Sequence, residues 1–165
     1  DWARRRCARP AWVKATATRH DQPYIGDISR RLASMRTLRD ASRSVYAAAG
    51  IKEPLKELDV AEIYEPVSYA ELAWYEALGF CPDGEAGRLI EDGVTALGGE
   101  LPVNPSGGVL SSNPVGASGV IRVAEAALQL HGRGGARQVE GARTALATGY
   151  GVYAWADVIL LGSTP

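Results

Sequence analysis

A segment rich in glycine and proline, residues 102–119, most constrains how this chain can fold. Its first part is typical of a flexible linker, and a linker would continue with polar residues. Instead, apolar residues follow at the spacing of a helix: Val120, Ile121, Val123, Ala124, Ala127, Leu128 and Leu130. The pattern therefore predicts a buried helix that begins near Gly116, with Asn113 at its mouth. Such a helix start presents a polar side chain to a ligand.

The length and charge of the chain narrow the possible classes of protein. With 165 residues, 46% of them hydrophobic, the chain is long enough for one domain with a core and too short for two ordinary ones. Its formal net charge of −1 comes from interspersed charges, which argues against nucleic acid as a partner. No segment approaches 18 uninterrupted apolar residues, so we expect no membrane span. The basic cluster at residues 4–9 is typical of a solvated end.

The two cysteines, Cys7 and Cys81, lie far apart and lack the neighbours of a metal or redox motif. We therefore expect no metal site, and a reducing, cytoplasmic setting.

Alternating and helical patterns predict a layered α/β fold. Strands are expected at residues 12–18, 58–64, 143–148 and 155–161. Helices are expected at residues 37–50, 68–78 (capped by Ser68), 85–92 and 116–130. Residues 93–108 are predicted to be irregular and to lie over a site, and residues 149–151 to form a turn between two strands that could pair directly. In α/β folds, ligands bind where loops leave the carboxyl ends of strands. Three segments compete for that position: residues 64–66, 113–114 and 149–151.

Longer motifs lie between residues 60 and 119, and the resemblance that they carry extends over nearly the whole chain. They are Val60-Ala-Glu-Ile-Tyr64-Glu-Pro66, Ala73-Trp-Tyr-Glu-Ala-Leu-Gly-Phe-Cys81, Gly87-Arg-Leu-Ile-Glu91, Leu101-Pro-Val-Asn-Pro-Ser-Gly-Gly108 and Asn113-Pro-Val-Gly-Ala-Ser-Gly119. Together they resemble the C-terminal half of a thiolase, of the sterol carrier protein x and lipid-transfer type. The resemblance implies a thiolase-like layered fold of two βαβαββ halves, with the nucleophilic cysteine on the half that is not in this chain. Residues 37–165 would form the C-terminal domain, and residues 1–36 the end of a preceding region with the first strand.

Asn113 departs from the thiolase pattern, because thiolases usually place there the histidine of a Gly-His-Pro motif. A neutral amide cannot act as a base, but it can donate a hydrogen bond to a thioester oxygen, and such a donor is worth roughly 3–4 kcal/mol. Asparagine is also a preferred helix cap, and Pro114 suits a helix start. Both interpretations of Asn113 stay open, and they are compatible.

A second departure concerns Gly149, which matches the position of the acid–base cysteine of thiolases. The nearby Gly151 could aim its backbone N–H at a developing oxyanion, or both glycines could serve only a tight turn. Cys81, at the end of an apolar helix, is no ready substitute and is interpreted as an inert thiol.

Tyr64 matches the position of the asparagine or histidine that holds a water molecule in thiolases. A phenol can transfer a proton if its pKa is lowered from about 10. This substitution resembles the aldolases of the lipid-transfer type, in which Tyr64 would take the substrate hydroxyl proton while Asn113 and the Gly151 N–H hold the enolate. Alternatively, Tyr64 is a buried aromatic residue at a strand end. Glu65 would be an orienting carboxylate or merely solvated.

The resemblance thus implies an enzyme that acts on a carbon–carbon bond of an acyl-CoA, either a thiolase-like acyltransferase or a retro-aldolase for a β-hydroxyacyl-CoA in lipid or steroid side-chain degradation. The candidate catalytic residues are Tyr64, Asn113 and Gly151, and the candidate substrate-binding residues are Gly107, Gly108 and Tyr150. No cofactor is expected beyond the coenzyme A of the substrate, and the chain alone would be inactive. Implied partners are a second copy in a thiolase-fold homodimer and an OB-fold zinc-ribbon protein that helps bind acyl-CoA. The alternative is a non-catalytic scaffold or partner-binding subunit. The glycines that this chain retains in its loops argue against that alternative.

Overall fold

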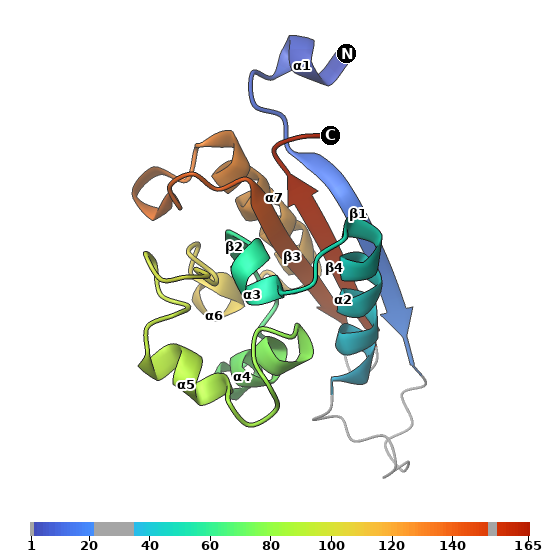
Figure 1. The fold of residues 1–165 in the computed structure, drawn as a ribbon, viewed down its shortest axis with the longest axis vertical. Helices are drawn as coiled ribbons and strands as arrows, with labels where there is room; N and C mark the ends of the chain where they lie inside the picture. The colour runs from blue at the N-terminus through green and yellow to red at the C-terminus, as the bar shows by residue number, and fades with distance from the viewer. Residues whose placement is uncertain (1, 22–34, 152–154) are drawn as a thin grey trace.

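The computed structural model describes residues 2–21, 35–151 and 155–165, which form a four-stranded mixed sheet with helices on both faces (Figure 1). The strand order is β1-β4-β3-β2. Strand β1 (Trp12–His20) pairs antiparallel with β4 (Trp155–Gly162), β4 pairs antiparallel with β3 (Thr144–Gly151), and β3 pairs parallel with β2 (Val60–Glu62). A parallel bridge between Ala61 and Val103 extends the sheet beyond β2.

The helices lie before and between these strands. They are α1 (Trp2–Arg6), α2 (Arg36–Ala49), α3 (Pro54–Glu57), α4 (Ser68–Ala77), α5 (Ala86–Glu91), α6 (Gly108–Ser111) and α7 (Ser118–His131), with the 3-10 turns η2 (Val115–Ala117) and η3 (Gly135–Arg137). No helix among the described residues is long and apolar enough to cross a membrane.

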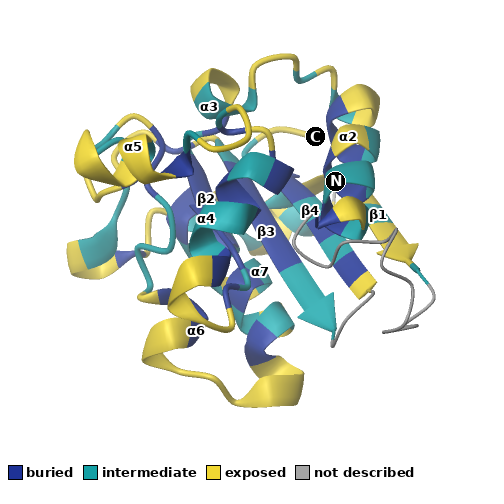
Figure 2. Ribbon diagram, turned by 90° about the horizontal axis from the view of Figure 1, so that it is seen from below, coloured by how far each residue is buried: buried dark blue, intermediate teal, exposed yellow. Residues whose placement is uncertain are grey.

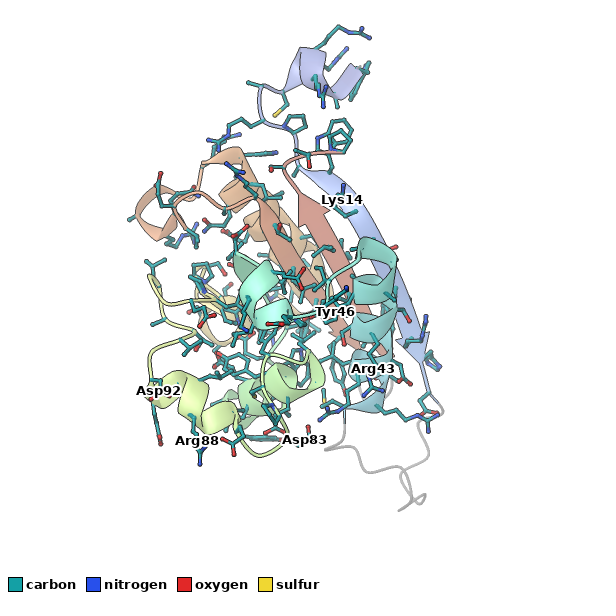
Figure 3. All side chains as sticks on the ribbon, in the orientation of Figure 1. Lys14, Arg43, Tyr46, Asp83, Arg88 and Asp92 are labelled. Atoms are coloured by element: carbon teal, nitrogen blue, oxygen red, sulfur yellow. The ribbon has the colours of Figure 1, made fainter. Side chains whose placement is uncertain are left out.

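Two hydrophobic clusters cover the two faces of the sheet, because successive side chains of a strand point to opposite faces. Leu146 of β3 points into the cluster that contains α2 and α4. Its neighbours Ala145 and Ala147 point into the cluster under α7. Tyr46 joins α2 to the end of α4 by donating its hydroxyl to the Leu78 carbonyl oxygen at 2.9 Å (Figure 3).

The carboxyl end of β3 is less covered than the rest of the strand. In Figure 2 the strand is buried along most of its length and becomes intermediate toward the arrowhead, at residues 149–151. This end of the sheet is therefore open to a ligand or to another chain segment.

The α/β class and the βαβαββ order predicted from the sequence are confirmed. The helix predicted for residues 37–50 is α2, which ends at Gly50 in the left-handed conformation with a φ of 77°. The first strand belongs to the same sheet as the later strands. The predicted domain boundary between residues 36 and 37 stays a prediction. Residues 22–34, which precede it, lie outside the described part of the chain.

Three local predictions were wrong. Residues 149–151 are not a turn but the last residues of β3, paired with residues 155–157, and the intervening residues 152–154 lie outside the described part of the chain. Ser68 does not cap α4, since Val67 is its N-cap and makes no side-chain hydrogen bond. Strand β2 is shorter than predicted because the Ile63 N–H donates to Asn104 Oδ1 at 2.6 Å instead of to a strand.

Candidate functional site

A mainly apolar cleft of about 390 Å³ lies between the start of α7 and the carboxyl end of β3. Its lining residues are Tyr64, Val115, Gly116, Gly119, Val120, Val123, Gly149, Tyr150, Gly151, Trp155, Asp157 and Ile159. Of the three segments predicted to converge, residues 64–66 and 149–151 thus each contribute to one cleft. Asn113 is not in the lining, but it lies two residues before Val115.

Glycines allow the walls of the cleft to approach each other closely. A Cβ atom on Gly119 would lie 3.5 Å from the Gly149 Cα, so α7 and β3 are almost in backbone contact there. A Cβ atom on Gly151 would lie 3.2 Å from Cδ2 of Trp155 and would collide with its six-membered ring. The indole of Trp155 therefore covers Gly151, and this packing accounts for the glycine whether or not its N–H binds a substrate.

Tyr64 follows β2 and is half-buried in the wall of the cleft. Its backbone N–H donates to Thr148 Oγ1 at 2.8 Å, which ties the end of β2 to β3. Tyr64 therefore lies at a strand's carboxyl end, as predicted. Its catalytic role stays a prediction.

Asn113 stabilises the start of α7. Its Oδ1 accepts hydrogen bonds from the Val115 N–H at 3.1 Å and from the Ser118 hydroxyl at 2.8 Å. The N-cap of α7 is Ala117, however, so the interpretation of Asn113 as the helix cap is wrong, and the residue supports the helix start from outside the cap position. The residue is exposed, and its amide NH₂ makes no hydrogen bond to any residue that the structure describes. The amide is thus available as a donor.

Tyr150 packs on the α4 side of the sheet. Its ring meets Trp74 edge-on, with ring centroids 4.9 Å apart and an interplanar angle of 67°. Burial raises the pKa of the Tyr150 phenol, so this group stays protonated near neutral pH. The predicted role of Tyr150 in substrate binding has to be compatible with this anchoring.

The other two candidate binding residues, Gly107 and Gly108, do not line the cleft. Gly108 is buried and has a φ of 64°. A Cβ atom there would collide with the Glu65 carboxylate and would lie 2.7 Å from Asn104 Nδ2. The glycine is thus required by a close approach of the loop to buried polar side chains.

Glu65 is one of these buried side chains, so the alternative that it is merely solvated is wrong. It is 1% exposed and accepts hydrogen bonds from Asn104 Nδ2 at 2.7 Å and from the Leu110 N–H at 3.1 Å. Burial raises the pKa of its carboxyl group, and these hydrogen bonds oppose the rise.

A second buried carboxylate, Glu62, forms a network with Ser106 and Arg122. Arg122 Nη1 donates to Glu62 Oε2 and to Ser106 Oγ, both at 2.8 Å, and Ser106 Oγ donates to Glu62 Oε2 at 2.6 Å. The sequence reasoning did not identify this network. The available signal was Arg122 itself, a charged residue within the apolar run that predicts α7.

The family model described as thiolase C-terminal domain-like matches residues 17–163. The chain belongs to this family. The resemblance to the C-terminal half of a thiolase, inferred from the motifs, is therefore confirmed.

Several relatives have names that mention lipid carriage or acyl-CoA chemistry. Sterol carrier protein 2 of Oryctolagus cuniculus is 41% identical over 123 residues, which are 74% of this chain and 22% of that protein. Acetyl-CoA acetyltransferase of Methanothermobacter thermautotrophicus is 38% identical over 149 residues, which are 86% of this chain and 37% of that protein. The solved structure of an Ltp2-ChsH2(DUF35) aldolase superposes with a TM-score of 0.74 at 25% identity, over 93% of this chain and 40% of that chain. The thiolase-like domain thus spans less than half the length of each of these relatives.

Proposed function

We propose that this chain is the C-terminal thiolase-like domain of an enzyme that cleaves a carbon–carbon bond of an acyl-CoA thioester. The observation that carries this proposal is the cleft, in which Tyr64 from the end of β2 lines the same cavity as Gly149 and Gly151 of β3 and the start of α7. The similarity to an acetyl-CoA acetyltransferase supports this class of substrate, and the similarity to an aldolase supports cleavage of a carbon–carbon bond.

Within this class, we propose retro-aldol cleavage of a β-hydroxyacyl-CoA. Tyr64 takes the proton of the β-hydroxyl group, which becomes a carbonyl as the bond between the α and β carbons breaks. The electron pair of that bond passes into the thioester carbonyl and forms an enolate, which then takes up a proton. Asn113 Nδ2 and the Gly151 N–H are the proposed donors to the enolate oxygen.

The side chains around the cleft support this choice over thiolysis. None of the described residues that line the cleft is a cysteine or a histidine. Cys81 lies outside the cleft, where burial raises the pKa of its thiol to about 11. Thiolytic cleavage would therefore depend on a cysteine from another part of the enzyme.

A non-catalytic role is the second candidate, as a scaffold or partner-binding domain. It is favoured by Asn113 and Gly149, which stand where the resemblance places a histidine and a cysteine. A titration of the full-length protein with acyl-CoA distinguishes the two candidates, because a scaffold binds none. A thiolase-fold homodimer and an OB-fold zinc-ribbon partner remain proposals for either role.

The test of the catalytic proposal is Tyr64→Phe in the full-length protein, assayed for cleavage of a β-hydroxyacyl-CoA to a carbonyl product. Loss of the proton acceptor should lower kcat by about 10²–10⁴-fold. Tyr69→Phe is the matched control, because Tyr69 is 76% exposed on α4 and outside the cleft. Unchanged turnover in Tyr64→Phe would remove Tyr64 from the chemistry.

A further inference from the structure

Three segments that carry candidate site residues are joined by one buried polar network. Glu62 is the last residue of β2 and lies two residues before Tyr64. Arg122 lies in the second turn of α7, three residues after Gly119 of the cleft wall. Ser106 lies in the loop that leads into α6 and completes the network through both partners.

The ion pair of the network is closed to solvent, whereas Ser106 is half-buried. Glu62 is 0% exposed and Arg122 is 2% exposed. Both Glu62 oxygens are used, since Oε1 accepts from the Ser106 N–H at 3.1 Å and Oε2 accepts from Arg122 and from the Ser106 hydroxyl. One donor of the network has no partner among the described residues, namely Arg122 Nε, which is buried.

Stability alone does not account for this arrangement. Burying an ion pair costs much of what the attraction returns, and well-packed apolar residues of similar volume are often as stable or more stable. The unpaired Nε adds a further cost. An apolar pair would lack directional bonds. It would therefore permit small sliding and rotation of α7.

Such sliding would change the shape of the cleft. Gly119 of α7 approaches Gly149 of β3 so closely that an added Cβ atom would be in van der Waals contact with the Gly149 Cα, at 3.5 Å. Asn113 binds Ser118, the first residue of α7, so a displacement of the helix would move Asn113 as well. The distances from Tyr64 to the start of α7 and to Asn113 therefore depend on where α7 is held.

We infer that Arg122 is a positioning residue, which through Glu62 and Ser106 fixes the start of α7 against the end of β2 and so sets the geometry of the cleft. This inference rests on the proposed acyl-CoA function. Arg122 itself does not line the cleft, so it acts through the residues that it holds.

The test compares Arg122→Met with the double variant Glu62→Leu/Arg122→Met in the full-length protein. Three quantities are measured: the melting temperature, kcat and KM for the acyl-CoA substrate, and hydrogen exchange of the backbone amides of residues 104–120. Arg122→Met leaves Glu62 buried and unpaired, so it should lower the melting temperature. The double variant should recover it, because no buried charge remains.

In both variants, we expect kcat to fall roughly 100-fold, as for a displacement of about 1 Å in a reacting geometry. We expect KM to change less than about threefold on the same principle, and amides 104–120 to exchange faster than in the parent. Arg137→Met is the control, because it breaks a more exposed ion pair with Glu125 of the same helix, and it should leave all three quantities unchanged.

Recovery of both the melting temperature and kcat in the double variant would overturn the inference, as would unchanged exchange of amides 104–120. Failure of the proposed function looks different, since the parent protein itself would then neither bind nor cleave acyl-CoA. The exchange measurement would in that case still decide whether Arg122 holds the start of α7.

Discussion

Gly108→Ala tests whether the loop over the buried carboxylates is held as tightly as the structure indicates. Gly108 has a φ of 64°, and a residue with a side chain pays about 1–2 kcal/mol in that region. The new Cβ atom would also lie 2.8 Å from Glu65 Cδ, so the carboxylate has to move. Losing one of its hydrogen bonds, such as the one from Asn104 Nδ2 or the one from the Leu110 N–H, costs about 1.5–3 kcal/mol for a charged group.

The expected loss in the free energy of unfolding is therefore about 2.5–5 kcal/mol. It can be measured by urea denaturation of the full-length protein, followed by circular dichroism. Gly50→Ala separates the two contributions, because Gly50 has a φ of 77° and an added Cβ atom would meet no atom within 4 Å. This control should lose only about 1–2 kcal/mol.

Equal destabilisation of Gly108→Ala and Gly50→Ala, within about 0.5 kcal/mol, would contradict the tight packing of residue 108 against Glu65. In that case the carboxylate of Glu65 would have room to move without losing its partners. The loop would then not depend on the absence of a side chain at residue 108.

Three further predictions concern single side chains. Asn113→Asp keeps the acceptor for the Val115 N–H but removes the amide donor. Thermal stability should therefore stay near that of the parent while kcat falls about 10²–10³-fold. Unchanged turnover would exclude Asn113 as an enolate donor. Burial raises the pKa of Glu65 above its unfolded value, so the protonated carboxyl group favours the folded state. This contribution to the free energy of unfolding is complete below about pH 4.3 and is lost as the pH rises through the folded pKa. Glu65→Gln should therefore gain stability relative to the parent between pH 4 and 7 in denaturation experiments, and parallel pH profiles would contradict the shift. Burial raises the pKa of Cys81 to about 11. At pH 8, iodoacetamide should therefore modify this thiol at least roughly tenfold more slowly than free cysteine, as measured by mass spectrometry. An equal rate would count against the raised pKa.

Much of the fold could be predicted from the sequence because the two periodicities record which side of each element is buried. The apolar stripe through Leu38, Ala41 and Val45 defined α2 to within one residue at each end, and Gly50 marked its end. Such signals are local. The short strand β2 was overestimated because a side chain 41 residues away, Asn104, takes the Ile63 N–H, and no local pattern contains that competition.

The candidate site was predictable only in part. The predicted strand ends placed Tyr64 and Gly151 at the same edge of the sheet, and both line the cleft. Gly107 and Gly108 belong instead to the loop over Glu65, where a glycine is required by packing. From the sequence, a glycine needed for a ligand and one needed for a neighbouring side chain have the same appearance.

The sequence by itself determined the layered α/β order, the family, and the absence of a histidine at residue 113 and of a cysteine at residue 149. These properties depend on residue identity and local spacing. Only the tertiary structure decided that Glu62, Ser106 and Arg122 form one buried network and that Trp155 covers Gly151. The physical reason is that burial and charge pairing arise between residues up to 60 positions apart, and the chain has to fold before a carboxylate acquires the neighbours that decide its role.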